Sequence, residues 1–167
     1  FMVDFEKADA SSVIATPMLS LAVNLQGSRD YVAHVGDTLL YSVVATNNTD
    51  ANLSGLTLTA VLEGTMYDIT SVHTDGSFDS RTKTLLWNSA VVPELGFLKA
   101  HQSVIVPFTV MLKSSFPSGL GTKDSFIKAS AHTETFNVPD GFPVESLSAS
   151  DELITRITTA PTFAQRL

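Results

Sequence analysis

The stretch VGDTLLYSVVATNNTDANLSGLTLTAVL, from Val35 to Leu62, decides the fold class of this chain. It opens on a Val-Gly-Asp turn signal, alternates between apolar and polar side chains, breaks into asparagine and aspartate, and then alternates again. In the first run, Leu39, Tyr41 and Val43 fall on one side. Because successive side chains of a β-strand point to opposite faces, this period of two predicts two strands joined by a turn, each with one buried face.

The same alternation returns from Val104 to Val110, and helical periodicity is scarce along the chain. Turn signals such as Asp75-Gly76-Ser77 separate the runs. Strands that follow one another without helices between them form antiparallel sheets, which pack most simply as a sandwich. We therefore predict an all-β domain with one side of each run in its core, namely Leu39, Tyr41, Val43, Leu56, Leu58, Trp87, Val104, Val106 and Phe108.

Two residues of these runs carry further expectations. Proline cannot donate to a β-ladder, so Pro107 predicts an edge position or a bulge in its strand. Trp87 alternates with Leu85 and is therefore expected in the core. An exposed Trp87 would instead be a platform on which a sugar stacks, but aromatic residues are only 8% of the chain, which disfavours that alternative.

The composition limits the classes of function. The chain is 44% hydrophobic, which is enough apolar material for a packed core. Its net charge of −7 disfavours nucleic acid and anionic membranes, which both attract basic surfaces. The absence of cysteine excludes disulfides, zinc fingers and thiol nucleophiles. No apolar run reaches the length of a membrane span, so we expect no membrane insertion. From the acidic net charge we expect no nucleic-acid partner.

No motif points to catalysis or to a cofactor. The four histidines are scattered, with none two or four residues from another, which is the spacing of a local metal-ligand pair. Ser80 and Lys83 form a Ser-x-x-Lys pattern in a predicted turn, and Ser125 and Lys128 form another in a predicted strand. That pattern is catalytic where both side chains share a helix face, which neither setting provides. We expect no catalytic, cofactor-binding or metal-binding residues.

Two oxygen-rich turns leave a lesser alternative open. The turns at 75–79 and 47–52 carry side-chain oxygens of the kind that Ca²⁺ binds, but neither holds the several carboxylates that the ion usually needs. Asparagine and aspartate also favour turns by bonding their own backbone, which is the simpler explanation. Asn47 and Asn52 each begin a glycosylation acceptor sequence, in a turn that we expect to be exposed.

Four motifs in order carry a resemblance to a known family. Gly36 to Asn47 follows the pattern Gly-Asp-x-Leu-x-Tyr, continues in alternation and ends on asparagine. Gly76 to Asp79 is a turn, Thr84 to Asn88 is a short run with a tryptophan, and Ser103 to Val110 follows the strand pattern Ser-Val-x-Val-x-Phe-x-Val. Together they resemble the tandem surface-protein repeat of prokaryotes known as the eleventh domain of unknown function, over roughly Met18 to Ala160. The resemblance implies an all-β, immunoglobulin-like antiparallel β-sandwich, often in tandem on cell surfaces, and no known activity.

The chain departs from the family pattern at three places. His101 stands where the family usually has glycine, the segment from Ser89 to Leu95 looks like an insertion, and Ala129 stands where asparagine is common. These departures concern the conformation of turns and leave the fold class unchanged.

The two ends of the chain favour a module cut from an array. Thr16-Pro17 and Ala160-Pro161 each follow a short strand-like stretch and precede another, although two such short matches can also coincide by chance. We therefore expect a leading segment at 1–17 (the last strand of a preceding repeat plus a linker), a sandwich domain at 18–160, and a trailing linker or next repeat at 161–167. A strand at 11–16 without its own sheet would be disordered, fold back on its own domain, or add to the edge of a neighbouring molecule as strand-mediated self-association. Pro107 disfavours its own strand as the acceptor along its full length, so we expect another edge to accept the segment.

One outward-facing set of side chains is unexpectedly apolar. Leu40, Val44 and Ile105 occupy positions where the alternation and the family pattern both favour polar residues. Either the loop from Ser89 to Leu95 or a flanking segment covers them, or they contact another molecule. We take these three residues as the candidate partner-contact patch.

These observations favour a non-catalytic structural or adhesive module of a cell-surface or secreted protein, in contact with neighbouring repeats or other surface proteins. The alternative is a ligand-binding module, for a polysaccharide or a protein, within a larger adhesin or enzyme. The chain opens FMVDFEKAD, with acidic residues where a signal peptide has basic ones, so we expect the targeting signal of an exported protein to lie outside this sequence.

Overall fold

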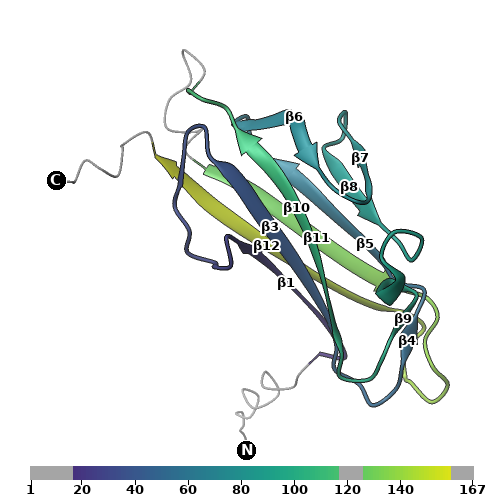
Figure 1. The fold of residues 1–167 in the computed structure, drawn as a ribbon. Helices are drawn as coiled ribbons and strands as arrows, with labels where there is room; N and C mark the ends of the chain where they lie inside the picture. The colour runs from purple at the N-terminus through teal and green to yellow at the C-terminus, as the bar shows by residue number, and fades with distance from the viewer. Residues whose placement is uncertain (1–16, 117–125, 159–167) are drawn as a thin grey trace, which may run out of the picture.

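Two β-sheets face each other in the computed structural model, which describes residues 17–116 and 126–158 (Figure 1). The four-stranded sheet has the order β1 (Leu19–Leu25), β3 (Thr38–Asn47), β10 (Ser103–Leu112) and β6 (Tyr67–His73). The six-stranded sheet has the order β2 (Ala33–His34), β12 (Leu147–Thr158), β11 (Phe126–Thr135), β5 (Thr57–Glu63), β8 (Thr84–Trp87) and β7 (Ser77–Asp79). A third pair joins β4 (Leu53–Ser54) to β9 (Phe97–Leu98), next to the 3-10 helix η1 (Pro93–Leu95).

The all-β, immunoglobulin-like sandwich is therefore confirmed. Its pairings are antiparallel apart from one short parallel contact, in which β2 lies beside the last two residues of β12. The segments 1–16 and 159–167, with the strand expected at 11–16, lie outside the described residues.

The core lies between the sheets and matches the expected one. All nine predicted side chains are at most 4% exposed. Tyr41 stacks on Phe108 with ring centroids 5.0 Å apart, and Phe108 lies 5.7 Å from Trp87 across the sandwich. Since Trp87 is fully buried, the alternative of a sugar-stacking platform is wrong.

A pair of tyrosines forms the polar centre of this core. The hydroxyls of Tyr41 and Tyr67 lie 2.7 Å apart, and both rings are buried. Burial raises the pKa of Tyr41 to about 12, because a phenolate would lose its hydration there. Burial also raises the pKa of Tyr67 well above its usual value, and the neighbouring Tyr41 adds to this shift. Both side chains are therefore neutral in the folded protein at physiological pH.

The tyrosine pair predicts a loss of stability in alkaline solution. In the unfolded chain both hydroxyls titrate near pH 10, whereas the folded chain keeps their protons. Above about pH 10 the unfolded state therefore binds fewer protons, and the free energy of unfolding falls by about 1.4 kcal/mol per pH unit for each tyrosine. Urea unfolding between pH 8 and pH 12 measures this slope. Tyr67→Phe should roughly halve it, and an unchanged slope in that variant would contradict the assignment.

The sequence predicts an edge position or a bulge at Pro107. Strand β10 pairs with β3 along its whole length, but β6 pairs only with Thr109, Met111 and Leu112, with a bulge between the first two. From Ser103 to Pro107, β10 has a described strand on one side only. Strand β10 is thus an inner strand of its sheet, but Pro107 lies on a stretch of it that is open on one side, and the bulge lies two residues further along.

The Gly-Asp turn before β3 is built from backbone geometry and one carboxylate. Gly36 adopts a φ of 81°, a conformation that residues with a Cβ rarely take. Asp37 then accepts hydrogen bonds from the His34 amide at 2.8 Å and from the Tyr31 hydroxyl at 3.0 Å. These contacts explain why a glycine followed by an aspartate begins the strand.

His101 carries strain that glycine would relieve. Its φ of 62° lies in the left-handed region, where the side chain crowds the backbone. Its ring contacts Asp50 at 2.7 Å, but both side chains are largely exposed, so the pair adds little. We expect His101→Gly to raise the free energy of unfolding by about 0.5–1 kcal/mol, measured by urea unfolding. Lys83 has a similar φ of 57°, and Lys83→Gly tests whether a gain is general to such positions.

Candidate functional site

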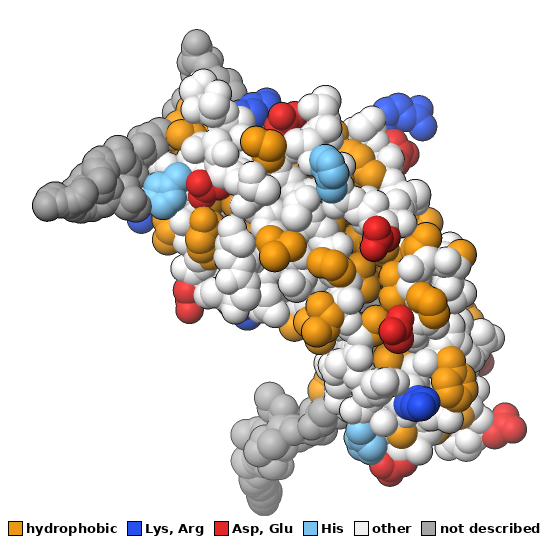
Figure 2. All heavy atoms as spheres, viewed as in Figure 1, with side chains coloured by type: hydrophobic (Ala, Val, Ile, Leu, Met, Phe, Trp, Pro, Cys, Tyr) orange, Lys and Arg blue, Asp and Glu red, His pale blue; other side chains and the backbone are white. Residues whose placement is uncertain are grey.

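The outer face of the four-stranded sheet holds the predicted patch. Val44 and Ile105 lie directly opposite each other in the β3–β10 register, and Ala22 of β1 faces Val44 from the other side. Leu40 lies further along β3, opposite Thr109. Figure 2 shows hydrophobic side chains gathered over the middle of this face, with few charges among them. The structure therefore joins Val44 to Ile105 and leaves Leu40 four residues away.

The expected cover over this patch is not formed by the loop from Ser89 to Leu95. Ile105 is 63% exposed and Leu40 is 44% exposed, while Val44 is half-buried among its neighbours. The loop turns the other way, since Leu95 is buried in the core and its carbonyl accepts a hydrogen bond from the Leu56 amide at 2.8 Å. That part of the expectation is wrong, and the other suggested cover, the segment before Pro17, lies outside the described residues.

A groove adjoins the patch where β6 stops. It has a volume of about 590 Å³ and runs between Leu40, Pro107 and the turn that joins β6 to β7. Phe78 and Val72 line its wall and are only partly exposed. On β10 the groove touches Pro107, Phe108 and Thr109, in the middle of the strand. Its lining mixes apolar side chains with the polar side chains of His73, Thr74 and Asp75, which suits an extended peptide better than a purely apolar ligand.

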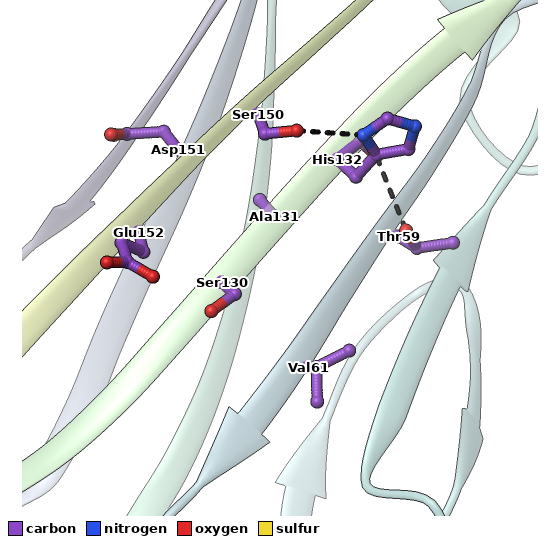
Figure 3. A pocket seen from close by; sticks show the side chains of 8 residues that line it. All are labelled: Thr59, Val61, Ser130, Ala131, His132, Ser150, Asp151 and Glu152. Carbon is purple, nitrogen blue, oxygen red and sulfur yellow. Dashed lines mark hydrogen bonds between the residues drawn. The ribbon is translucent and has the colours of Figure 1, made fainter.

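The outer face of the six-stranded sheet holds a different set of side chains (Figure 3). His132 on β11 contacts the Ser150 hydroxyl through Nδ1 at 2.9 Å and the Glu134 carboxylate through Nε2 at 3.0 Å. Thr59 of the next strand points toward the same hollow, and its hydroxyl donates weakly to the His132 carbonyl at 3.4 Å. Sequence reasoning missed this group, because Ser150 and Thr59 become neighbours of His132 only through strand pairing.

Ser150, His132 and Glu134 are linked in the order serine, histidine, carboxylate, as in a hydrolytic triad. Their setting does not support that chemistry. The side chains of His132 and Glu134 are 44% and 38% exposed on an open sheet face. Activation of a serine needs donors aimed at an oxyanion within a site that excludes water. At this level of exposure, the His132–Ser150 contact is an ordinary cross-strand pair and the His132–Glu134 contact an ordinary pair along one strand of a solvated sheet face.

The oxygen-rich turn after β3 is organised around Asn47. This side chain is fully buried, and its amide nitrogen contacts the carbonyl oxygens of Ala51 at 2.8 Å, Leu98 at 3.0 Å and Lys99 at 3.1 Å. Its amide oxygen accepts from the Thr49 hydroxyl at 2.7 Å and from the Thr49 amide at 3.0 Å. Asn47 thus joins the turn after β3 to the turn before β10.

The structure bears on two expectations about the oxygen-rich turns, glycosylation and metal binding. A fully buried Asn47 cannot accept a glycan in the folded chain, so the expected exposure of that acceptor is wrong, whereas Asn52 is exposed. Among the described residues, no group of three histidine, aspartate or glutamate side chains is placed to hold a metal ion. In the turn at 75–79, Asp79 accepts from the Arg81 amide at 2.9 Å, which is the backbone bonding expected of such turns.

A second group of polar contacts joins β1 of one sheet to β12 of the other. Arg29 donates to the Asp151 carboxylate at 2.6 Å and to the Val23 carbonyl at 2.8 Å. Asp151 also accepts from the Val23 amide at 2.9 Å. The outer backbone groups of Val23, on edge strand β1, are thereby bonded to side chains instead of to a further strand. We call this contact the Arg29–Asp151 clasp.

Within residues 17–116 and 126–158, no helix has the length and hydropathy needed to cross a membrane. A scan against protein-family models gives no match, and a search of curated proteins gives none either. The resemblance to the surface-repeat family therefore depends on its four sequence motifs alone.

Several solved structures have a similar fold. The major pilin subunit BcpA of Bacillus cereus aligns with a TM-score of 0.51 at 10% identity, over 84% of this chain and 40% of the pilin. A cohesin–dockerin complex of Clostridium thermocellum aligns at 0.49 and 11% identity, over 86% of this chain and 97% of that one. The major pilin SpaD of Corynebacterium diphtheriae aligns at 0.49 and 13% identity, over 83% and 34%. At such identities the likeness shows the fold: this chain is built like a β-sandwich domain of a bacterial pilin.

Proposed function

We propose that this chain is a non-catalytic structural or adhesive module of a cell-surface or secreted protein, and one unit of a tandem array. The observation that carries the proposal is the direction of the first and last strands. Leu19 at the start of β1 pairs with Asn47, whereas Thr158 at the end of β12 pairs with His34, next to the Asp37 turn. These contacts lie at opposite ends of β3, and Figure 1 shows the described chain entering at one end of the sandwich and leaving at the other.

Such a geometry suits a spacer in a linear chain of domains. A neighbour attached before residue 17 and another attached after residue 158 would lie on one axis, as in a stalk. Tension along that axis would load β1 and β12 in opposite directions, and the Arg29–Asp151 clasp joins these two strands. The expected domain limits, 18–160 with linkers on either side, accord with this arrangement.

The alternative, a ligand-binding module, is supported by the exposed side chains of Leu40 and Ile105, with the half-buried Val44 beside Ile105, and by the groove that Leu40 lines. A protein partner fits these surfaces better than a polysaccharide, because the chain's tryptophan is buried and unavailable for stacking.

Single-molecule pulling between handles placed before residue 17 and after residue 158 tests the structural proposal. We expect the module to unfold in one cooperative event. Arg29→Ala should lower the unfolding force and reduce the free energy of unfolding by about 0.5–1 kcal/mol, a modest value because the pair is partly exposed. Arg81→Ala is the matched control, since Arg81 is highly exposed and its contact with Asp79 spans 3.8 Å.

Gradual yielding without a force peak would contradict a tension-bearing role. Equal forces for Arg29→Ala and Arg81→Ala would contradict the role of the clasp. Antibody labelling of intact cells that naturally produce the protein tests its location, and labelling only after lysis would exclude a surface module.

A further inference from the structure

The first half of β10 has a free, regular edge. Gln102 accepts from the Asn47 amide at 2.9 Å, and Leu112 donates to the Asp37 carbonyl at 2.8 Å, so the even-numbered positions of β10 bond toward β3. In an antiparallel ladder the alternate residues direct their backbone groups to the other side. Thr109 and Met111 face β6 there, whereas Ser103, Ile105 and Pro107 face no described strand. Pro107 therefore lacks its N–H on the open side, so the β3 ladder loses nothing, but an added strand loses one bond. The expectation that Pro107 directs an added strand to another edge is revised here, because Ser103 and Ile105 keep their N–H groups on this side.

Other edges of the sandwich are less suited to accept a strand. On β1, the clasp bonds both outer backbone groups of Val23. On β6, the Thr70 amide donates to the Asp68 side chain at 3.1 Å, and the strand is bulged against β10. Strands β2 and β7 have two and three residues, which gives an added strand little to pair with. Strand β12 pairs with β2 through its last two residues only, but further back it lies beside β1, where Asp151 is held in the clasp and the Glu152 carbonyl accepts from Arg29 at 3.3 Å. The edge from Ser103 to Pro107 keeps an unbroken register with β3, and its Pro107 end borders the groove.

We propose that this edge accepts the segment Ser11-Ser12-Val13-Ile14-Ala15-Thr16 of a second copy of the chain, as an added β-strand. The inference rests on the proposed function as an array-forming surface module and names the contact through which its copies associate. Three of the six residues, Val13, Ile14 and Thr16, are β-branched, which favours a strand, and the segment contains no proline. An extended segment of this length spans about 20 Å, which covers the five residues of the open edge.

Residues 11–16 of one chain cannot reach the open edge of β10 in that same chain. Leu19 is fixed on β1 by its pairing with Asn47, and Asn47 in turn pairs next to the start of β10. From β1 across β3 and β10 to an added strand is three strand spacings, or about 14 Å. The three residue steps from Thr16 to Leu19 reach at most about 11 Å. A strand at 11–16 therefore cannot lie on its own open edge while β1 is paired.

The test uses the full chain and two proline variants, one on each side of the contact. Ile105→Pro removes an amide on the open side, and Ile14→Pro removes one from the added strand. Ile105→Thr is the matched control, because it removes the exposed apolar side chain and leaves the backbone intact. Sedimentation velocity measures association over a range of concentrations, and hydrogen exchange by NMR measures protection of the Ile105 amide.

We expect association of the parent chain, with the Ile105 amide gaining protection as concentration rises. Each proline variant should weaken association by at least about tenfold, as loss of main-chain bonds predicts, while Ile105→Thr stays within about threefold of the parent. Ile14→Pro changes no residue of the described sandwich, so it keeps the test valid if Ile105→Pro fails to fold.

Three results would overturn the proposal. These are a chain that stays monomeric at every concentration, an association that Ile105→Thr abolishes as fully as Ile105→Pro, and an Ile105 amide already protected in the monomer. The second would assign the contact to the apolar face, and the third to a strand within one chain. A monomer that still unfolds in one cooperative event under tension would refute this contact alone, whereas loss of that event would refute the proposed function.

Discussion

Replacing Asn47 with aspartate should lower the free energy of unfolding by about 3–5 kcal/mol, close to the loss caused by an unpaired buried charge. The substitution preserves shape but turns the donor that contacts the Ala51, Leu98 and Lys99 carbonyls into an acceptor. A carboxylate would then face three carbonyl oxygens in a fully buried position. Urea unfolding followed by circular dichroism measures the change.

Asn52→Asp is the control for charge. Asn52 is exposed, and its side-chain oxygen accepts from the Ala100 amide at 3.1 Å, a bond that aspartate keeps. It should change stability by no more than about 0.5 kcal/mol. Similar losses for the two variants would show that Asn47 does not hold the two turns together.

The second large effect is expected at Trp87. Trp87→Ala should cost about 3–5 kcal/mol, because it opens a cavity in the centre of the sandwich and removes the ring against which Phe108 packs. The backbone around Trp87 is closely packed, since a Cβ at Gly76 would come within 2.2 Å of the Leu86 carbonyl oxygen and 2.6 Å of the Trp87 ring. The backbone at Gly76 therefore has little freedom to move into the cavity.

Leu86→Ala is the matched control on the same strand, since Leu86 points outward and is 39% exposed. It should cost less than about 1 kcal/mol. Because the chain has one tryptophan, unfolding of the Trp87 variant must be followed by circular dichroism instead of fluorescence. A cost for Trp87→Ala no greater than that for Leu86→Ala would contradict the central place given to this ring.

Where a strand alternates, its sequence is enough to predict its place. Strands β3 and β10 bury every second residue over ten positions, so Leu39, Tyr41 and Val106 could be assigned to the core by period alone. Pro107 was equally informative, because its missing donor restricts where it can lie. By contrast, Tyr67 begins a bulged strand without regular alternation, and its burial against Tyr41 depends on a partner 26 residues away.

The polar contacts of the surface were beyond the reach of sequence. Asn47 resembles an exposed turn residue in the sequence, and only the approach of β9, some 50 positions later, turns it into a buried donor. The partners of the clasp, Arg29 and Asp151, are 122 positions apart, and neither lies in a motif. The exposure of Ile105 followed from alternation, but the open edge beneath it depends on where β6 stops pairing.

The start of β1 and the end of β12 lie at opposite ends of β3, which has a mechanical consequence. Strand β12 has 12 residues, so in the proposed array one folded module would add about 40 Å to the contour length. Residues 17–158 amount to 158 − 16 = 142 residues, which would extend to about 480 Å once unfolded. Since the chain has no cysteine, no disulfide shortens this release. Unfolding of one module would therefore lengthen the array by roughly ten times the length of the folded module. A single unfolding event would lower the tension on the array before its attachment failed.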